Sequence, residues 1–298
     1  MCIRDRAMML ELSRAVQRVL IRPEVSGVVV TQPADNIEET AYFVSISLSD
    51  VFQNQNSKPI VFTTCMNPED PMFDGTKNLL DSIRVACHDV KGDIPTVVVC
   101  MNGEIHAASR AQLTHTNKAS ALASPGWGPV GYVDRDNVYF RCGALELDTG
   151  LNFPMLKKLT AKVPVVKAMC GDDGALLEMV LEKEPDAIIV EGFGRGNLPA
   201  GMMPAIKKAV KKGIFVVIST RASSGRVLDS TVFPGSVAQC LESGCLLAGE
   251  TTTAKARLLL MYVLSQKEAI QLKKEDPERF FAYVQECLDP VLTNRLFG

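Results

Sequence analysis

The sequence predicts an α/β protein with two domains. Short apolar runs rich in β-branched residues, typical of strands buried on both faces of a parallel sheet, alternate with segments of helical apolar spacing. This alternation predicts an α/β architecture with right-handed crossovers. It occurs in two runs of different length. We therefore predict a larger N-terminal domain at 7–145, a linker at 146–162 and a smaller C-terminal domain at 163–298.

Composition narrows the function. The chain has 298 residues, 47% of them hydrophobic, and a formal net charge of −2, which gives no electrostatic case for a nucleic-acid or membrane partner. No apolar run approaches the ~20 residues of a membrane span. Nine cysteines without a CxxC pair, together with three histidines, argue against a zinc site and against a disulfide framework. Reduced thiols in a cytoplasmic protein are expected.

The start of the chain needs separate treatment. Residues 1–6 match nothing that follows and are interpreted as an assembly or cloning scar. The chain then opens directly in an apolar-periodic helix that includes Met9, Leu12 and Val16. Because a doubly wound domain normally opens with a strand, we expect that the natural N-terminus and a first strand are missing. An exposed sheet edge or a gap in the N-terminal core, with a risk of aggregation, is the expected consequence.

The first predicted strand leads into a candidate site. Gly27 precedes a β-branched run at 28–30, and Pro33, which has no N–H for a ladder, ends the strand. Asp35 fits the N-cap of a helix at about 36–50, with Glu38 completing a capping box. The polar loop from Gln32 onward therefore lies beyond the carboxyl end of a strand, where open α/β sheets bind ligands. The alternative is that Asp35 only caps its helix.

The rest of the N-terminal domain continues the alternation. A loop at 107–135 is long enough to suggest function, and it contains His115, which is either a solvated histidine or a group poised near neutral pH. The other predicted elements are a strand at 59–64, a helix bearing Leu79, Leu80, Ile83, Val85 and Ala86, a strand at 95–101 with a hairpin into 104–106, and strands at 132–133 and 138–140.

The C-terminal domain shows the same alternation, followed by a helical tail. The predicted elements are strands at 163–169, 187–190 and 214–219, helices at about 174–183 and 199–212, and tail helices at 254–264 and 280–292.

Two polar turns in this domain invite functional interpretations. Gly192, Gly194 and Gly196 follow a strand, but a dinucleotide fingerprint needs Gly or Ala where Asn197 stands, and no phosphate-loop motif occurs. A tight turn with Asn197 as N-cap is the simpler interpretation, which leaves a nucleotide-binding protein as a third choice. Asp172 and Asp173 either cap a helix or bind a cation, although one carboxylate pair is weak evidence for a metal.

Several ordered motifs of the first half resemble the bacterial-type L-asparaginase/glutaminase family. The segment Val28-Val-Val-Thr-Gln-Pro-Ala-Asp-Asn-Ile-Glu-Glu-Thr-Ala41 is similar to the family's strand followed by His-Gly-Thr-Asp-Thr-Met-Glu-Glu-Thr-Ala. Phe73-Asp-Gly-Thr-Lys-Asn-Leu79 resembles Ala-Asp-Gly-x-x-Asn-Leu. Residues 110–116 stand where the family has Arg-x-Val-Thr-Lys-Thr, and Ser124-Pro-Gly-Trp-Gly-Pro-Val-Gly131 matches Ser-Pro-x-x-Gly-Pro-x-Gly.

The second half carries the resemblance on. Gly194-Arg-Gly-Asn-Leu-Pro199 resembles the family's Gly-Asn-Gly-Asn-x-Pro, and Thr253-Ala-Lys-Ala-Arg257 resembles Thr-Pro-x-Lys-Ala-Arg. The resemblance covers about residues 8–265. It implies a flavodoxin-like N-terminal domain with a parallel sheet, a smaller C-terminal α/β domain, and assembly as a homodimer or homotetramer. It also implies cofactor-free hydrolysis of the side-chain amide of a small amino acid to carboxylate and ammonia.

The family's chemistry uses a Thr nucleophile on a first strand, a Thr-Lys-Asp group beside it and an oxyanion site. The nucleophile strand and the Ser-bearing loop for the substrate carboxylate have no match here, so any nucleophile would lie upstream of residue 7. Ala34, which is inert, stands at the second Thr, and His115 stands at the Lys. Asp35 matches the Asp that binds the substrate ammonium, and Asn197 matches the residue that reaches a neighbouring subunit's site in family tetramers. Gln32, Asp35 and Asn197 are thus the candidate substrate-binding residues.

Two functional hypotheses follow. The first is a divergent, N-terminally truncated amidohydrolase in which Asp35 holds an ammonium and His115 acts as general base or hydrogen-bond donor. This chain is then expected to be inactive, or nearly so, as given. The second is a catalytically inactive relative that binds a small ligand or serves as an assembly subunit. The sequence leaves the true substrate, the oligomer size and the role of residues 266–298 open.

Overall fold

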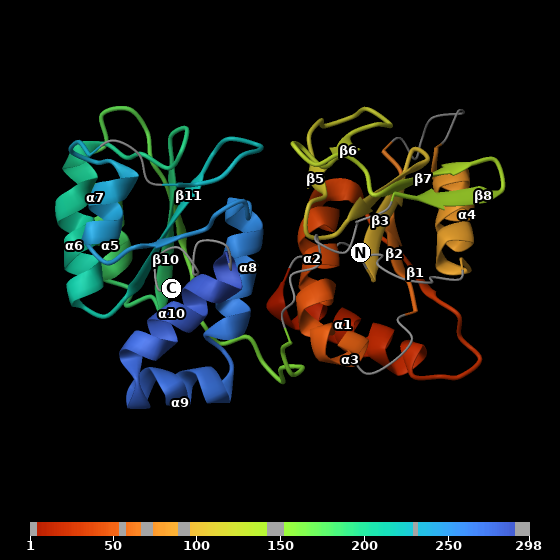
Figure 1. Ribbon diagram of the computed structural model, residues 1–298, viewed down its shortest axis with the longest axis horizontal. Helices are drawn as coiled ribbons and strands as arrows, with labels where there is room; N and C mark the ends of the chain where they lie inside the picture. Colours follow the sequence, from red (N-terminus) through yellow and green to blue (C-terminus); the bar gives the residue numbers. More distant parts are fainter. Residues whose placement is uncertain are drawn as a thin grey trace. The chain divides into compact units, whose positions relative to one another are not determined.

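The structure, a computed structural model, describes residues 5–53, 58–66, 74–88, 96–141, 152–228 and 232–289. The chain divides into two compact units, Met1–Lys157 and Lys158–Gly298. The boundary between the units falls within the linker predicted at 146–162. Each unit is built on its own sheet with helices on both faces, so the predicted two-domain α/β class is confirmed (Figure 1).

The N-terminal unit contains a mixed six-stranded sheet in the order β1-β2-β3-β4-β7-β8. The first three strands, β1 (Val28–Thr31), β2 (Ile60–Thr63) and β3 (Val97–Met101), run parallel. The sheet then continues antiparallel through β4 (Glu104–Ala107), β7 (Gly131–Asp134) and β8 (Asn137–Phe140). The loop predicted at 107–135 holds a small ribbon of β5 (Gln112–Leu113) and β6 (Leu122–Ala123).

Helices cover both faces of this sheet. On one face lie α1 (Arg6–Leu20) and α2 (Ile37–Ser47), preceded by the short η1 (Ala34–Asn36) and followed by α3 (Ser49–Gln53). The other face is covered by α4 (Gly75–Ala86) (Figure 1). Alternate side chains of a strand point to opposite faces of the sheet, so each strand contributes to the core on both faces. Val28 and Val30 pack with α1 and α2, whereas Val29 packs with α4.

Strand β1 is less buried than predicted. Its three valines are half-buried, whereas β2 and β3 are buried throughout. The amides of Val28 and Gln32 donate to Pro59 (2.9 Å) and Thr63 (3.2 Å) on the β2 side. Alternate residues must face the other way, and among the described residues no strand pairs with that edge. The apolar run fits a central strand as well as an edge strand, which is why periodicity missed the difference.

The predicted capping box is wrong. Asp35 lies inside η1, the N-cap of α2 is Asn36, and neither end uses a side-chain cap. The carboxylate of Glu38 instead accepts from the amide of Leu113 (2.7 Å). Because Leu113 is distant in the sequence, the local spacing could not show this partner.

The apolar face predicted for α4 is also partly wrong. Leu79, Leu80 and Ile83 are exposed, whereas polar side chains of the same helix are buried. Asn78 explains this orientation, because its side-chain amide donates to the carbonyl of Thr64 (2.9 Å) and its oxygen accepts from the amide of Asn102 (2.9 Å). These bonds tie the helix to the ends of β2 and β3, and so decide which face of α4 is turned inward.

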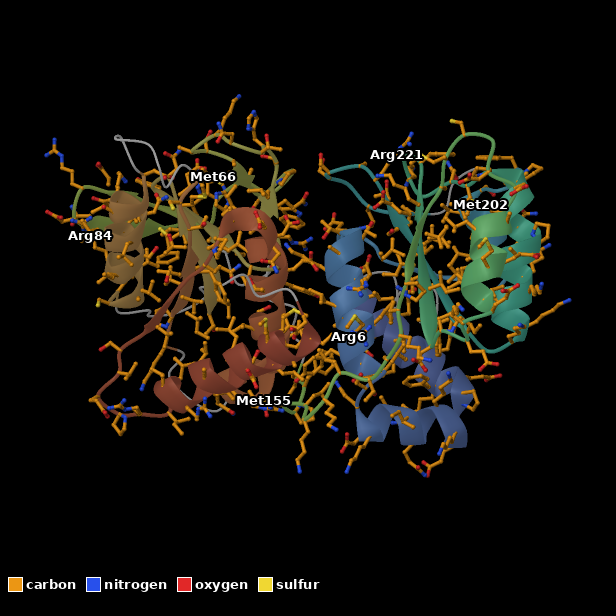
Figure 2. The ribbon with its side chains drawn as sticks, turned by 180° about the vertical axis from the view of Figure 1, so that it is seen from behind. Arg6, Met66, Arg84, Met155, Met202 and Arg221 are labelled. Carbon is orange, nitrogen blue, oxygen red and sulfur yellow. The ribbon has the colours of Figure 1, made fainter. Side chains whose placement is uncertain are left out.

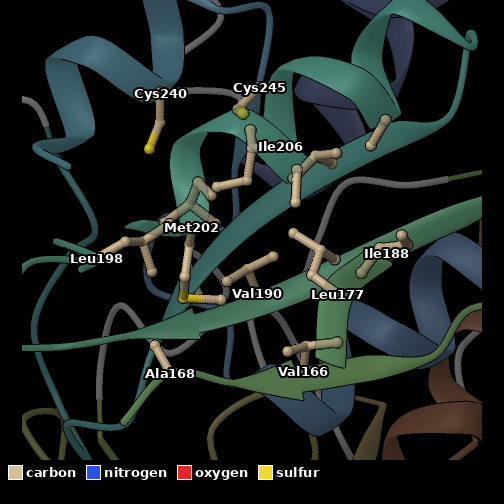
Figure 3. Close-up of a cluster of buried hydrophobic side chains, with 14 of the residues drawn as sticks. Val166, Ala168, Leu177, Ile188, Val190, Leu198, Met202, Ile206, Cys240 and Cys245 are labelled. Carbon is tan, nitrogen blue, oxygen red and sulfur yellow. The ribbon is translucent and has the colours of Figure 1, made fainter. Parts of the chain in front are cut away.

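The C-terminal unit has a parallel four-stranded sheet in the order β12-β11-β10-β9. Its strands are β9 (Val165–Lys167), β10 (Ala187–Gly192), β11 (Phe215–Thr220) and β12 (Leu246–Leu247). A continuous apolar core joins the sheet to α5 (Ala175–Leu181), η3 (Ala200–Met202), α6 (Met203–Lys211) and α7 (Val237–Glu242) (Figure 3). Neither α7 nor β12 was predicted, since both are too short to show a period.

The helical tail belongs to this unit. It comprises α8 (Thr253–Val263), α9 (Lys267–Glu275) and α10 (Pro277–Leu288). The apolar spacing did not predict α9 as a separate helix. The predicted end at 292 lies outside the described residues. Gln285 of α10 is fully buried, and its side chain accepts from the amide of Leu247 (2.9 Å) and donates to the carbonyl of the same residue (3.0 Å). The tail thus satisfies the backbone of β12.

Replacing Gln285 by Ala should destabilise the fold. The substitution leaves a buried amide and a buried carbonyl of Leu247 unsatisfied, at about 1–3 kcal/mol per group. We expect Q285A to lower the free energy of unfolding of the C-terminal unit by about 2–4 kcal/mol in urea titrations, with local relaxation and added water reducing the full sum. Gln271 is exposed on α9, so Q271A is the matched control and should change little. Equal effects of the two substitutions would contradict this role of the tail.

Candidate functional site

A pocket of about 660 Å³ opens at the carboxyl ends of β1 and β2. Its walls come from the last residues of these strands, from η1, from the first turn of α4 and from Thr116 in the long loop. Met66, labelled in Figure 2, lies just beyond the end of β2 and contributes one wall. The position agrees with the general rule that ligands of open α/β sheets bind outside the carboxyl ends of the strands.

The pocket brings together three of the predicted site residues, Gln32, Ala34 and Asp35. Asp35 is exposed and supplies a carboxylate. The side chain of Gln32 is oriented by Thr40, whose hydroxyl donates to its Oε1 (2.9 Å). Its Nε2 is buried and has no hydrogen-bond partner in the described part of the chain. The loop after β1 therefore brings the carboxylate of Asp35 to the pocket.

Five threonines that the sequence analysis missed also line the pocket. Two of their hydroxyls donate to backbone carbonyls, that of Thr63 to Cys100 (2.9 Å) and that of Thr64 to Cys65 (3.3 Å). The other three, Thr31, Thr76 and Thr116, are exposed. They lie in three separate segments, each within one of the motifs that carry the family resemblance, but no single segment shows that the three meet at one pocket.

Cys65 is a thiol in this pocket, but its environment does not activate it. Burial raises its pKa above the usual value, and the neighbouring carboxylate of Asp74 raises it further. The thiolate is the nucleophilic form of cysteine, so Cys65 stays a neutral thiol near pH 7.

The start of α4 supplies hydrogen-bond donors. Gly75 and Thr76 line the pocket, and the amides of a helix's first turn have no partner inside the helix. Asp74 precedes them and is held in place, because its carboxylate accepts from the amide of Met66 (3.3 Å) and from Nδ2 of Asn78 (3.1 Å). The positive end of this helix therefore already faces a carboxylate.

The long loop is fastened to the scaffold at two places. Glu38 of α2 accepts from the amide of Leu113 (2.7 Å). Further along, Ser124 forms a hydrogen bond with Nδ1 of His106 on β4 (3.0 Å), and both side chains are buried. These contacts bracket the segment that carries Thr116 and so support its position at the pocket.

His115 is held in a local turn. Its Nδ1 accepts from the amides of Asn117 (3.0 Å) and Lys118 (3.2 Å), so the neutral ring carries its proton on Nε2. His115 is not among the residues that line the pocket, although Thr116 is. Both predicted roles of His115, general base and hydrogen-bond donor, stay predictions.

Asn197 lies in the C-terminal unit, and its predicted N-cap role is wrong. The helix that follows its turn begins only at Met203 after η3, and the Oδ1 of Asn197 accepts instead from the amide of Val237 at the start of α7 (3.2 Å). The turn itself is closed by a bridge between Phe193 and Asn197. A Cβ on Gly192 would lie 2.6 Å from the carbonyl of Gly196, so glycine is required by close packing there.

The aspartate pair of this unit serves its own backbone. Asp172 accepts from the amide of Met169 (2.6 Å), and Asp173 from that of Ala175 at the start of α5 (2.9 Å). Across the parts of the chain that the structure describes, no group of three or more metal-ligating side chains occurs. Within the same parts, every helix is too short or too polar to cross a bilayer.

Two family models match the chain. The model described as Asparaginase, N-terminal, matches residues 4–144, and the model described as Glutaminase/Asparaginase C-terminal domain matches residues 162–275. An L-asparaginase of Bacillus licheniformis is 31% identical over 89% of this chain and 80% of its own length. A glutaminase-asparaginase of Pseudomonas aeruginosa is 27% identical over 87% of this chain and 69% of its own length.

Among solved structures, the chain is similar to a probable cytoplasmic L-asparaginase from Campylobacter jejuni. The TM-score is 0.78 at 27% identity, and the match covers 94% of this chain and 82% of that one. The likeness therefore extends over both units.

The buried His106 beneath the loop predicts a pH dependence of stability. Burial lowers its pKa, and the nearby carboxylate of Glu104, 3.4 Å from Nε2, only partly opposes this. Because the folded-state pKa lies below the unfolded value of about 6.5, the unfolded state binds the proton more readily. The stabilising contribution is thus present above pH 6.5 and is lost as the pH falls through the folded-state pKa.

We expect His106→Gln to remove this component. The difference in free energy of unfolding between the unsubstituted chain and H106Q should shrink as the pH is lowered from 7.5 to 5, as measured by urea titrations. A difference that grows at low pH would show that His106 is stabilised in its charged form, contrary to the burial argument.

Proposed function

The chain belongs to the asparaginase family, and on this premise we propose that it is a divergent amidohydrolase whose reacting groups are altered. The reaction of this type adds water across the side-chain amide of an amino acid, which breaks the C–N bond and releases ammonia and a carboxylate. The observation that carries the proposal is the position of Asp35, which lines a pocket at the carboxyl ends of β1 and β2. This is the residue that the family resemblance assigns to the substrate ammonium.

The groups that remain can bind a substrate and stabilise charge. Asp35 attracts an ammonium, and the first amides of α4 at Gly75 and Thr76 can donate to a carbonyl or to an oxyanion. The groups that would activate an attack are changed. Ala34 has no hydroxyl where the resemblance implies a threonine, and the Nδ1 of His115 is engaged by two amides where the resemblance implies a lysine. The pocket thus retains groups that can bind a substrate but lacks groups that would activate an attack on it.

The finer features of the proposal follow the family. We propose a small amino acid amide as substrate, no cofactor, a cytoplasmic location, and assembly as a homodimer or homotetramer in which Asn197 contributes to a neighbouring site. The Campylobacter jejuni neighbour, described as a probable cytoplasmic enzyme, supports the location. Solution mass measurements on the purified chain test the assembly.

The same alterations favour a second candidate function, a catalytically inactive relative that binds a small ligand. Its supporting observation is Ala34, because an alanine can neither attack nor relay a proton. Calorimetric binding of an amino acid or amide without turnover would favour this candidate. A pH–rate profile controlled by His115 would favour the enzyme.

We predict no appreciable hydrolysis of L-asparagine by this chain. General acid–base groups contribute about 10²–10⁴-fold each, so their loss should leave ammonia release at the level of the Asp35→Ala control. The measurement is ammonia release over hours at pH 7.5, with chain and D35A at equal concentration. Release well above that of D35A would show that a working nucleophile and base are present.

A further inference from the structure

We propose that Cys240 and Cys245 form a site of reversible oxidation, at which the two thiols join in a disulfide when the chain meets hydrogen peroxide. The inference goes beyond the proposed function and does not depend on it. It rests on the way in which α7 ends, on the contact between the two side chains, and on the difference between their surroundings.

The end of α7 brings the two cysteines together. The helix ends in a Schellman motif, in which two amides beyond the helix bond back to carbonyls of its last turn. The amide of Cys245 donates to the carbonyl of Cys240 (3.0 Å), and the amide of Gly244 donates to that of Leu241 (2.8 Å). Gly244 has φ 89°, the left-handed conformation that this motif requires. The bond from one cysteine to the other is compatible with the ~4.4–6.8 Å between Cα atoms that a disulfide needs.

The two side chains also meet. Residues at these two positions of a Schellman motif frequently pack against each other. Here the thiol of Cys245 forms a hydrogen bond with the sulfur of Cys240. Both side chains are buried and belong to the core cluster of the C-terminal unit (Figure 3). A disulfide would therefore replace a contact that the folded chain already makes.

The surroundings of the two thiols give them different roles. The hydrogen bond from Cys245 lowers the pKa of the Cys240 thiol, whereas that bond, together with burial, raises the pKa of Cys245. Because the thiolate is the nucleophilic form of cysteine, Cys240 is the thiol that attacks the oxidant. Cys245 is then the partner that closes the disulfide.

Two other buried cysteines provide a comparison within the same chain. Burial raises the pKa of both Cys100 and Cys287 to about 12. In the described part of the chain, Cys100 forms a hydrogen bond with Ser82 and Cys287 with Tyr283, and neither of these partners can form a disulfide. Burial alone therefore predicts an inert thiol, and the paired arrangement distinguishes Cys240 and Cys245.

Hydrogen peroxide supplies the oxidising equivalents. The thiolate of Cys240 attacks one peroxide oxygen and the O–O bond breaks, which gives a sulfenic acid on Cys240 and a hydroxide. The hydroxide takes up the proton that the thiol released and leaves as water. The sulfur of Cys245 then attacks the sulfenic sulfur, the S–O bond breaks, and a second water leaves with the proton of the Cys245 thiol. The two thiols lose two electrons in total, and the peroxide is reduced to water.

Local opening at the end of α7 gives the oxidant access. This helix has only six residues, and Glu242 at its end is exposed. Short surface elements open at a lower free energy than the core strands and helices of a domain. The new bond closes a loop of only a few residues and so constrains the unfolded chain little. The disulfide is therefore a reversible modification and not a structural cross-link.

Peptide mass spectrometry of the oxidised chain tests the inference. Trypsin releases residues 227–255 as one peptide that contains both cysteines. The folded chain is treated with hydrogen peroxide, and the remaining thiols are alkylated in denaturant. We expect this peptide to lose two hydrogen atoms and to carry no alkyl group, whereas Cys100 and Cys287 are alkylated. Dithiothreitol should restore both thiols, and oxidation of the exposed Cys170 shows that the oxidant is active.

Two variants separate the roles of the pair. In Cys245→Ala, the reaction should stop at the sulfenic acid of Cys240, which dimedone traps as an adduct. In Cys240→Ala, no adduct should form on Cys245. Cys100→Ala changes an equally buried thiol and is the matched control, in which the disulfide should form as before. Thermal melts confirm that the variants are folded, and the mapping of the unsubstituted chain does not depend on them.

Three results would overturn the inference. One is a peptide 227–255 that stays reduced while Cys170 is oxidised. Another is oxidation of Cys100 and Cys287 to the same extent as the pair, because that pattern indicates unfolding. The third is an adduct on Cys245 in C240A with none on Cys240 in C245A, which contradicts attack by Cys240. None of these results bears on amide hydrolysis, which is measured separately by ammonia release.

Discussion

The parallel pairing of β1 with β2 is the interaction on which the site depends, because it sets the two strand ends that open into the pocket. Close packing fixes this pair against α4. A Cβ on Gly27 would come within 2.1 Å of the carbonyl of Ala86, so the start of β1 and the end of α4 approach as closely as a glycine allows. At the other end of α4, Asn78 bonds to the carbonyl of Thr64. The start of the helix, with Gly75 and Thr76, and the strand ends are thereby held in one arrangement.

The sequence predicted those elements of the fold that have an apolar period or a recognisable motif. Strands and the two-domain class follow from apolar patterning, the hairpin after Met101 follows from the Asn102-Gly103 turn, and the Gln32–Asp35 segment follows from its place after a strand. What it could not foretell depends on contacts between distant segments. Glu38 looked like a capping residue because its partner, the amide of Leu113, is far away in the sequence. Thr116 became a pocket residue only because the loop is fastened over the sheet, whereas His115, its neighbour, turned to its own backbone.

The site illustrates how a scaffold can keep recognition while its reacting groups change. The carboxylate of Asp35 and the amides at the start of α4 require only that β1, β2 and α4 stay packed together. Attack on an amide requires in addition a hydroxyl or a base with the correct partner, and the alanine at 34 removes one such group. Recognition and turnover therefore respond to different residues.

The most direct test is to locate the ligand on the chain by amide chemical-shift perturbation with L-asparagine. We predict that the largest shifts lie at Gln32 to Asp35, at Gly75 and Thr76, and at Thr116, all within the N-terminal unit. We predict no comparable shifts in the turn at 192–197. Shifts centred on that glycine-rich turn, with Asp35 unaffected, would contradict the assignment of the functional site to the carboxyl ends of β1 and β2.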